Sequence, residues 1–420
     1  MIRRIKGVKD ILPDDIPKWD VIETAARRLA TIYGFREIRI PIFEQTDLFA
    51  RSIGTTTDIV EKEMYTFQDL DKTSLTLRPE GTAGAVRAYI ENNLGSVPSA
   101  QKMFYLGPMF RHESPQAGRQ RQFHQLGVEF FGNPHVGADV EVMAFLWHFF
   151  ADLKLRDLTL EVNSLGEPAD RSRYRTLLVK FLEARRDCLC VNCRGRLERN
   201  PFRILDCKEA GCRDATRDAP MMTDHLSERA RSQFEDVRSG LSALGIPYTV
   251  NPRLVRGLDY YTLTAFEVTS LSPHLGAQNA LGGGGRYDGL VEGLGGPSTP
   301  AVGFAAGLER IALVLPPEAR TPQPKMVFVA AFGKDGEAAG TRVLQALRAL
   351  GVSSETLHGA STLKAHLRQA DRRGALLTAI IGDDEAAEGV VLLRDMTTKA
   401  QEKLPLSSAP DMIAARVFSA

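Results

Sequence analysis

The segment LVRGLDYYTLTAFE, residues 254–267, places a fixed cation, an acid and two phenols beside an apolar, strand-like run. Arg256 and Asp259 flank a Gly-Leu pair, and Tyr260 and Tyr261 follow. A strand in a hydrophobic core gains nothing from these charges, because unpaired buried charge is costly. A site that holds a small polar molecule next to a phosphate group would use all of these side chains. The segment therefore predicts a ligand site built around one strand.

The composition is that of an ordinary globular protein. The chain has 420 residues, 43% hydrophobic and 25% charged, which suits two or three domains of roughly 150 residues each. Because the net charge is only +1, any contact with a polyanion must come from local basic patches. The chain has no apolar run of the roughly 18 residues that a membrane span needs, and its basic N-terminus lacks a signal-peptide core. We expect a cytoplasmic protein.

Changes in composition divide the chain into four predicted parts. A core is interrupted by a charged, helix-prone segment that contains all five cysteines, and we expect this segment to be an inserted helical subdomain. A proline-rich run, Pro316 to Pro324, links the core to a small alternating α/β domain. The predicted parts are residues 1–166 and 236–316 for the core, 167–235 for the insertion and 325–420 for the last domain.

A polar hairpin is predicted at residues 101–132, with two strands joined by a long charged loop. Arg111 and Glu113 lie two residues apart on the first arm and so share a face. Gln125 and Glu129 share a face of the second arm for the same reason. Such a face is either solvated or the wall of a polar pocket, and neighbouring glycines, which let a ligand approach the backbone, favour the pocket.

Four arginines are candidates for phosphate binding, because a guanidinium binds phosphate oxygens in pairs and keeps its charge. The alternative for each one is a surface salt bridge. Neither GxxxxGK[ST] nor GxGxxG occurs in the chain, and the glycine run within residues 281–289 is predicted to be a turn. The candidate arginines are Arg111, Arg119, Arg256 and Arg310.

Blocks along nearly the whole chain resemble, in order, the signatures of histidyl-tRNA synthetases, a family of class II aminoacyl-tRNA synthetases. FRHE and GLER resemble motifs 2 and 3, which the whole class shares, whereas RGLDYY and FHQLGVE resemble the blocks specific for histidine. The matching blocks are LTLRPEGTAG (75–84), FRHESPQAGRQRQFHQLGVE (110–129), LVRGLDYYTLTAFE (254–267), LGGGGRYDGL (281–290) and VGFAAGLERI (302–311).

The resemblance implies an α+β fold with an antiparallel six-stranded sheet flanked by helices, a helical insertion and a C-terminal α/β anticodon-binding domain. It implies a homodimer formed through residues 18–43, where periodicity alone leaves a subunit interface and an ordinary core element open. In the implied reaction, L-histidine and ATP are converted into histidyl-adenylate and pyrophosphate. The histidyl group then passes to tRNA(His), AMP leaves, and Mg²⁺ would assist departure of the pyrophosphate.

The resemblance also assigns roles by position. Arg256 and Arg111 would be the catalytic pair, since a preorganised guanidinium stabilises charge that builds on the α-phosphoryl group. Arg310 would hold the γ-phosphate, and Phe123 would stack on the adenine ring. The predicted ATP-binding residues are Arg111, Glu113, Arg119, Phe123 and Arg310.

Histidine recognition would need partners for both ring nitrogens, because neutral imidazole has one donor and one acceptor. Glu129 and Tyr261 resemble these imidazole contacts. A pocket built for such bonds rejects analogues that lack them by roughly 10⁴–10⁵-fold, so no editing domain is needed. The predicted histidine-binding residues are Glu80, Gly81, Thr82, Gln125, Glu129, Arg256, Tyr260 and Tyr261.

The hairpin loop from Ser114 to Arg121 would face the tRNA acceptor end, with Gln116 and Arg121 as contacts. Ser114 departs from the commonest bacterial pattern, in which an arginine often occupies this position. In the last domain, basic residues spaced four apart form either an RNA-facing stripe or a solvated helix face. These residues are Lys364, Arg368 and Arg372.

The cysteines lie close together in the sequence, and their odd number argues against a disulfide framework. Four thiolates on two short loops would suit a tetrahedral structural Zn²⁺ in the insertion, although the second pair is loosely spaced. Cys188 would be spare. The predicted ligands are Cys190, Cys193, Cys207 and Cys212.

Two other functions fit parts of the pattern. One is the non-catalytic paralogue of this family, a regulatory subunit of the enzyme that begins histidine biosynthesis. It usually lacks the C-terminal domain and parts of the RGLDYY and motif 3 blocks, which this chain keeps. The other is a sister synthetase for proline, threonine or glycine, against which FHQLGVE and RGLDYY argue.

Overall fold

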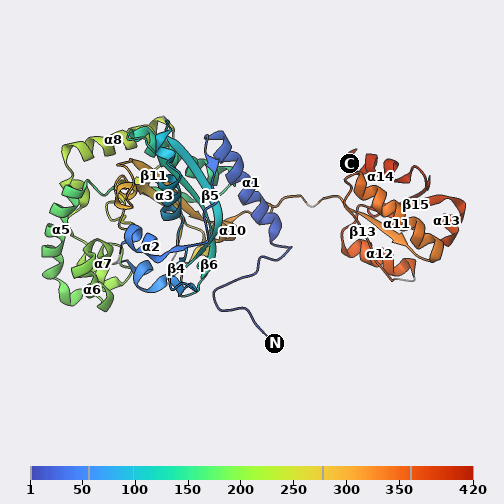
Figure 1. Cartoon of the computed structure of the whole chain (residues 1–420), viewed down its shortest axis with the longest axis horizontal. Helices are drawn as coiled ribbons and strands as arrows, with labels where there is room; N and C mark the ends of the chain where they lie inside the picture. Colours follow the sequence, from blue (N-terminus) through green and yellow to red (C-terminus); the bar gives the residue numbers. More distant parts are fainter. Residues whose placement is uncertain are drawn as a thin grey trace. The chain divides into compact units, whose positions relative to one another are not determined.

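The computed structural model describes residues 2–54, 57–97, 99–276, 279–322, 324–359 and 362–419. The chain forms two compact units, Met1–Thr321 and Pro322–Ala420 (Figure 1). One residue of the predicted linker, Gln323, lies outside the described residues. In the described part of the chain, no helix is both long and apolar enough to cross a membrane.

The first unit is built on an eight-stranded sheet in the order β1-β5-β6-β11-β10-β9-β7-β8. The six inner strands pair antiparallel, whereas the two-residue edge strands β1 and β8 run parallel to their neighbours. The predicted six-stranded antiparallel sheet is thus the centre of a larger mixed sheet, and the prediction was wrong about its edges. The bounds are β1 Arg36–Glu37, β5 Gln101–Phe110, β6 Gln122–Phe131, β11 Ala301–Gly307, β10 Ala280–Arg286, β9 Thr262–Ser270, β7 Leu158–Ser164 and β8 Thr249–Val250.

Strand alternation gives the sheet one apolar and one polar face. Phe104, Val128, Phe266 and Phe304 point into the main core, where helices cover the sheet. The polar face carries the intervening residues of the same strands. The helices of the core side are α1 Ile16–Ile32, α4 Val136–Asp152, α8 Glu228–Ala243 and α10 Leu308–Val314.

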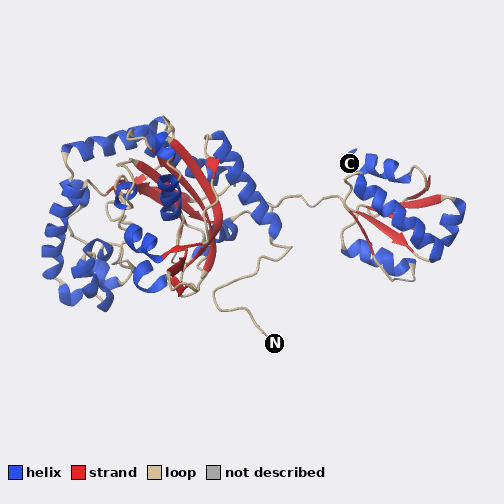
Figure 2. Ribbon diagram, viewed as in Figure 1, coloured by secondary structure: helices blue, strands red, loops and turns tan. Residues whose placement is uncertain are grey.

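The insertion lies across the sheet from α1 (Figure 1). Described residues 167–235 are helical or irregular and contain no strand (Figure 2). Tyr174, Leu178 and Leu197 belong to a separate small core there. The insertion helices are α5 Pro168–Glu183, α6 Val191–Arg199 and α7 Ala210–Ala215, followed by α8.

The remaining elements of the first unit lie around the polar side. A three-stranded antiparallel sheet has the order β2-β4-β3. Its strands are β2 Phe43–Gln45, β4 Ser74–Leu77 and β3 Tyr65–Gln68, and the nearby helices are α2 Thr46–Ile53, α3 Thr82–Glu91 and α9 Leu290–Gly293.

Local predictions failed where the sequence lacked periodicity. The glycine run, predicted to be a turn, is the central strand β10, where a Cβ at Gly283 would lie 2.7 Å from the Phe266 carbonyl oxygen. Residues 254–261 form a loop before β9 and not a strand. Arg111 and Glu113 follow β5 in the hairpin loop, so they do not share a strand face.

The second unit has a five-stranded sheet in the order β13-β12-β14-β15-β16. Its first three strands are parallel and its last two pair antiparallel. The elements are β12 Val327–Ala331, α11 Lys334–Ala349, β13 Ser354–Thr356, α12 Leu363–Arg372, β14 Leu377–Ile381, α13 Asp383–Glu388, β15 Val390–Asp395, β16 Gln401–Pro405 and α14 Ala409–Ser419.

Candidate active site

A pocket opens over the polar face of the main sheet, and segments distant in sequence line it. They include the start of α3, the hairpin loop with β6, the loop before β9, the strands β9, β10 and β11, and the start of α10. The predicted residues that line it are Glu80, Thr82, Arg111, Glu113, Arg119, Phe123, Gln125, Arg256, Tyr260, Tyr261 and Arg310.

One end of the pocket is cationic. Arg111 is fixed by its Nε donating to the Pro79 carbonyl at 2.8 Å, and its guanidinium lies 5.3 Å from the centre of the Phe123 ring. Arg310 donates to the carbonyls of Gly118 and Ala280 at 3.1 and 2.7 Å.

Burial lowers the pKa of both guanidinium groups of this end, and the positive charge of other arginines lowers it further. Converging cations that destabilise one another are suited to bind a polyanion such as a triphosphate.

Arg256 lies between this end and the phenols. Its Nη1 lies 2.6 Å from Oε2 of Glu267 on β9, and its guanidinium lies 5.7 Å from the centre of the Tyr261 ring. Its Nε is buried and has no hydrogen-bond partner among the described residues. Glu267 ends the segment LVRGLDYYTLTAFE, but its sequence context predicted no role for it. This acid fixes one edge of the guanidinium and leaves the other free to bind a ligand.

The other end of the pocket is lined by an acid, an amide and phenols. The Glu80 carboxylate accepts hydrogen bonds from the backbone NH groups of Thr82 and Ala83, at 2.7 and 2.8 Å, and burial raises its pKa. The buried Oε1 of Gln125 has no partner in the described part of the chain. The ring centres of Tyr260 and Tyr261 are 4.6 Å apart. A small ligand with amino and carboxylate groups fits this combination of donors and acceptors.

Glu129 lies beneath the pocket, with 1% of its surface exposed, and does not line it. Its Oε1 accepts from Thr82 Oγ1 at 2.7 Å and from the Tyr105 hydroxyl at 3.1 Å, and the Tyr287 hydroxyl donates to Oε2. Burial raises the pKa of Glu129 to about 8 and outweighs the three hydroxyl donors, which lower it. Neither tyrosine was predicted from the sequence, because a single aromatic residue on a strand resembles a core residue.

Besides Glu129, three residues predicted to contact histidine or tRNA do not line the pocket. Gly81 is the residue before α3, where a Cβ would lie 2.6 Å from the Tyr105 hydroxyl oxygen, so its position reflects packing. Gln116 is exposed on the hairpin loop. Arg121 is joined to the N-terminal segment, because its backbone NH donates to the Gly7 carbonyl at 2.6 Å.

Asp259, the least explained member of the opening segment, links the pocket loop to the insertion. Its Oδ1 accepts from Asn200 Nδ2 at 2.8 Å, and its backbone NH donates to the Ile53 carbonyl at 3.2 Å. Arg171 on α5 donates to the carbonyls of Asp259 and Tyr261 at 3.4 and 2.9 Å. The insertion therefore holds the loop that carries Arg256 and both tyrosines.

Comparison with known proteins agrees with a pocket that suits a triphosphate and an amino acid. A family model described as histidyl-tRNA synthetase matches residues 7–167 and 204–311, and one described as anticodon binding domain matches residues 326–416. The chain belongs to the histidyl-tRNA synthetase family. A protein named histidine–tRNA ligase from Desulforudis audaxviator is 50% identical over 98% of both chains.

Other histidyl-tRNA synthetases agree over the full length. The histidine–tRNA ligase of Geobacter sulfurreducens is 48% identical and covers 99% of this chain and all of its own. An apo crystal structure of the S. aureus histidyl-tRNA synthetase aligns with a TM-score of 0.82 at 39% identity, covering 99% of this chain and 100% of that one. The family resemblance read from the sequence blocks is thus confirmed.

Proposed function

We propose that the chain is an ATP-dependent ligase that joins L-histidine to tRNA(His). The observation that carries the proposal is the pocket of this chain, where a cationic end lies next to an amide and two phenols. Its similarity to histidine–tRNA ligases agrees with this pocket. Arg111, Arg310 and Arg119 would bind the ATP phosphates. Arg256, between the two ends, would contact the α-phosphate when the histidine carboxylate attacks it.

Histidine would occupy the end lined by Glu80, Gln125, Tyr260 and Tyr261. Among the described residues, Thr82 links Glu129 to the pocket, because its hydroxyl donates to Oε1 of Glu129. We propose that Glu129 recognises the imidazole ring of histidine together with the phenols of Tyr260 and Tyr261. Mg²⁺ would neutralise charge on the pyrophosphate, a contribution expected of phosphoryl chemistry.

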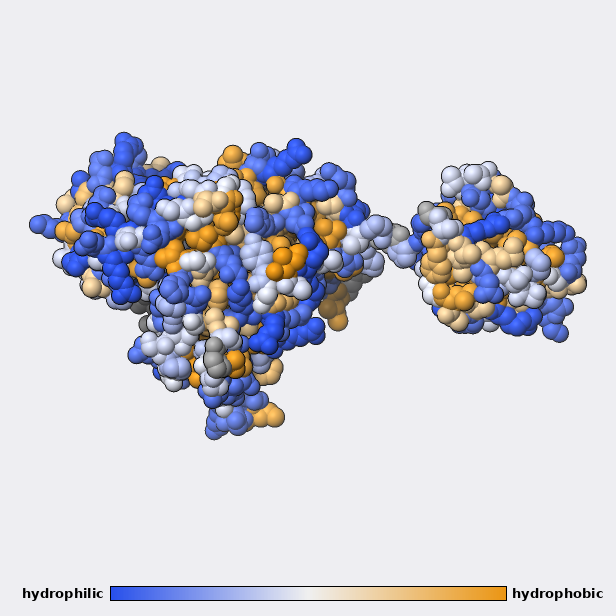
Figure 3. All heavy atoms as spheres, turned by 90° about the horizontal axis from the view of Figure 1, so that it is seen from above, coloured by the Kyte–Doolittle hydropathy of each residue, from blue (hydrophilic) through white to orange (hydrophobic). Residues whose placement is uncertain are grey.

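The proposed partners, tRNA(His) and a second copy of the chain, follow from membership of the histidyl-tRNA synthetase family. The anticodon-binding match at residues 326–416 supports tRNA as the third substrate, beside L-histidine and ATP. A homodimer through residues 18–43 is supported by apolar side chains that remain exposed there, Ile32, Ile42 and Phe43. The face of the molecule in Figure 3 carries hydrophobic patches among hydrophilic residues. Sedimentation of the purified chain tests the dimer, which a monomeric mass at micromolar concentration contradicts.

Histidine-dependent exchange of pyrophosphate into ATP tests the activation step. We expect exchange with histidine and none with proline, threonine or glycine, followed by charging of a tRNA(His) transcript. Exchange with another amino acid would assign the chain to a sister synthetase. Absence of exchange with any amino acid would indicate a regulatory binding protein.

A further inference from the structure

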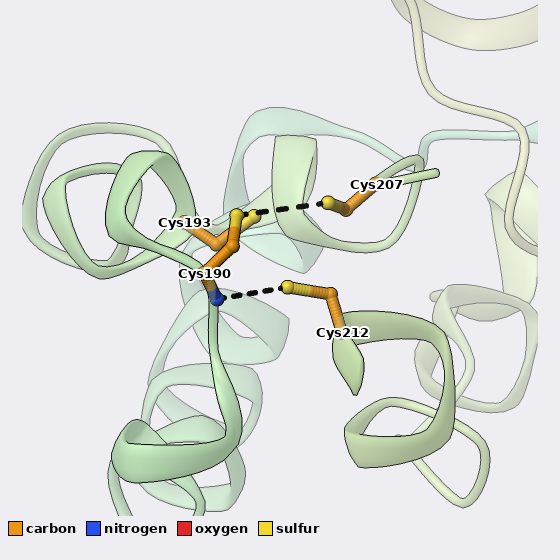
Figure 4. A group of neighbouring side chains, drawn as sticks. All are labelled: Cys190, Cys193, Cys207 and Cys212. Atoms are coloured by element: carbon orange, nitrogen blue, oxygen red, sulfur yellow. Dashed lines mark hydrogen bonds between the residues drawn. The ribbon is translucent and has the colours of Figure 1, made fainter. Parts of the chain in front are cut away.

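Four cysteines of the insertion gather around one point (Figure 4). None of them lines the active-site pocket. The first two come from the start of α6, the third precedes α7 and the fourth lies on α7. All five cysteines of the chain are free thiols. The four sulfur atoms, which all lie within 4.8 Å of one another, are those of Cys190, Cys193, Cys207 and Cys212.

The spacing of these sulfurs fits one tetrahedral ion. A Zn–S bond of about 2.3 Å puts the sulfurs of a tetrahedral site roughly 3.8 Å apart, and the sulfurs of Cys190 and Cys207 are 4.0 Å apart. The backbone NH of Cys190 donates to Sγ of Cys212 at 3.1 Å, so the first and last cysteines of the group are in direct contact. An iron–sulfur cluster needs room for several atoms between its cysteines, whereas this arrangement leaves room for one ion.

The segment between the two cysteine pairs, residues 194–206, contacts the catalytic core. Arg196 Nη2 lies 2.9 Å from Asp58 Oδ2, and Arg199 Nη1 lies 2.6 Å from Glu61 Oε1. These ion pairs are partly exposed, and such pairs alone hold two elements together weakly. Leu197 and Ile204 of the same segment are buried in the small core of the insertion, and a bound ion would add a second constraint to this packing.

The same segment reaches the active-site loop through Asn200. Its Nδ2 donates to Asp259 at 2.8 Å, two residues before Tyr261 and three after Arg256. An ion bound by cysteines on both sides of residues 194–206 would close this segment into a loop and restrict the positions open to Asn200. The geometry thus connects the cysteine cluster to the histidine end of the pocket.

We propose that the four clustered cysteines bind one structural Zn²⁺, and that this ion fixes residues 194–206 so that Asn200 positions the loop of Arg256, Tyr260 and Tyr261. The ion is remote from the reacting atoms, and Asn200 acts as a positioning residue. The effect on catalysis rests on the proposed function, whereas zinc binding does not.

Metal analysis of the whole chain tests the binding step. We expect one zinc per chain after purification without added metal, one zinc in Cys188→Ser and far less than one in Cys193→Ser. Cys188 is the matched control, because it is exposed and lies outside the cluster. Should Cys193→Ser fail to fold, Co²⁺ added to the chelator-treated parent decides, through the charge-transfer absorption of a tetrathiolate site. Bound iron, or a parent that takes up neither Zn²⁺ nor Co²⁺, overturns the proposal.

Kinetics of pyrophosphate exchange test the positioning step. Asn200→Ala removes a hydrogen bond to a carboxylate, so we expect the KM for histidine to rise about tenfold and the KM for ATP to change less. Removal of zinc by a chelator should shift the KM in the same direction, and ZnCl₂ should restore it. An unchanged KM after proven zinc loss overturns the positioning role. A parent that shows no exchange with histidine refutes the proposed function instead, and the zinc content then stands by itself.

Discussion

Single side chains of the pocket differ in how their charge is balanced, and Arg256 is the most directly testable. One edge of its guanidinium pairs with Glu267, while its buried Nε has no partner among the described residues. Arg256→Ala should lower the rate of histidine-dependent pyrophosphate exchange by about 10²–10³-fold, because one preorganised donor to the transition state is lost. Histidine binding, followed by calorimetry, should weaken much less.

The control for this substitution is Arg156→Ala, which removes an exposed arginine outside the pocket lining. It should leave exchange unchanged. An Arg256→Ala rate close to that of the parent would show that the charge on the α-phosphoryl group is stabilised by another residue.

Glu129 should make the stability of the ligand-free protein depend on pH. Its folded pKa of about 8 lies above the ordinary value of 4.5, so its contribution to stability is fully present below pH 4.5 and is lost as pH rises through 8. The free energy of unfolding should fall by up to about 1.4 kcal/mol per pH unit across this window. Glu129→Gln, which cannot ionise, should lack this component.

Thermal unfolding of parent and Glu129→Gln from pH 5 to pH 9 measures the difference. Subtracting the two curves removes titration of every other group. Parallel curves across this window would mean that Glu129 is already ionised in the folded protein at low pH.

At the scale of elements, the strand β10 depends on having no side chains. A Cβ at Gly283 would lie 2.7 Å from the Phe266 carbonyl oxygen and 2.7 Å from Arg256 Nη1. Gly283→Ala should therefore destabilise the fold by about 1–3 kcal/mol and reduce exchange activity, because both the strand pairing and the arginine must shift. The matched control is Gly289→Ala, where a Cβ meets no atom within 4 Å.

Unfolding midpoints and exchange rates of these two variants are the measurements. Equal stability of Gly283→Ala and its control would show that β10 tolerates a side chain.

The strand β10 could not be predicted from the sequence. Four consecutive glycines have no alternating pattern, so the sequence does not distinguish a buried strand from a turn. The two-residue strands β1 and β8 are too short for any periodicity.

The pocket residues were easier to predict than the elements that carry them. Arg256 and Glu113 stand out because a charge next to an apolar run needs an explanation, whether its backbone is a strand or a loop. Tyr105 and Tyr287 could not be found in this way, since their hydroxyl bonds to Glu129 depend on residues that are distant in sequence. Asp259 was noticed but not explained, because its partner Asn200 belongs to the insertion.

At the scale of the whole molecule, the two units have separate hydrophobic cores. The core of the main sheet and the two cores of the second unit share no residue. The lining of the active-site pocket lies entirely between Ile59 and Arg310. Activation of histidine should therefore be a property of the first unit, and recognition of the tRNA should need both.

A chain truncated after Thr321 tests this division. It should retain histidine-dependent pyrophosphate exchange within about threefold of the full chain, because no pocket residue is removed. A tenfold loss would correspond to about 1.4 kcal/mol of activation free energy. It should lose most of its charging of tRNA(His), because the anticodon-binding match is removed.

The full chain with Lys364, Arg368 and Arg372 replaced by alanine separates two explanations of that loss. These residues are exposed on α12, and reduced charging with normal exchange would identify them as an RNA-binding stripe. Normal charging would leave them a solvated helix face, and loss of exchange in the truncated chain would refute the independence of the first unit.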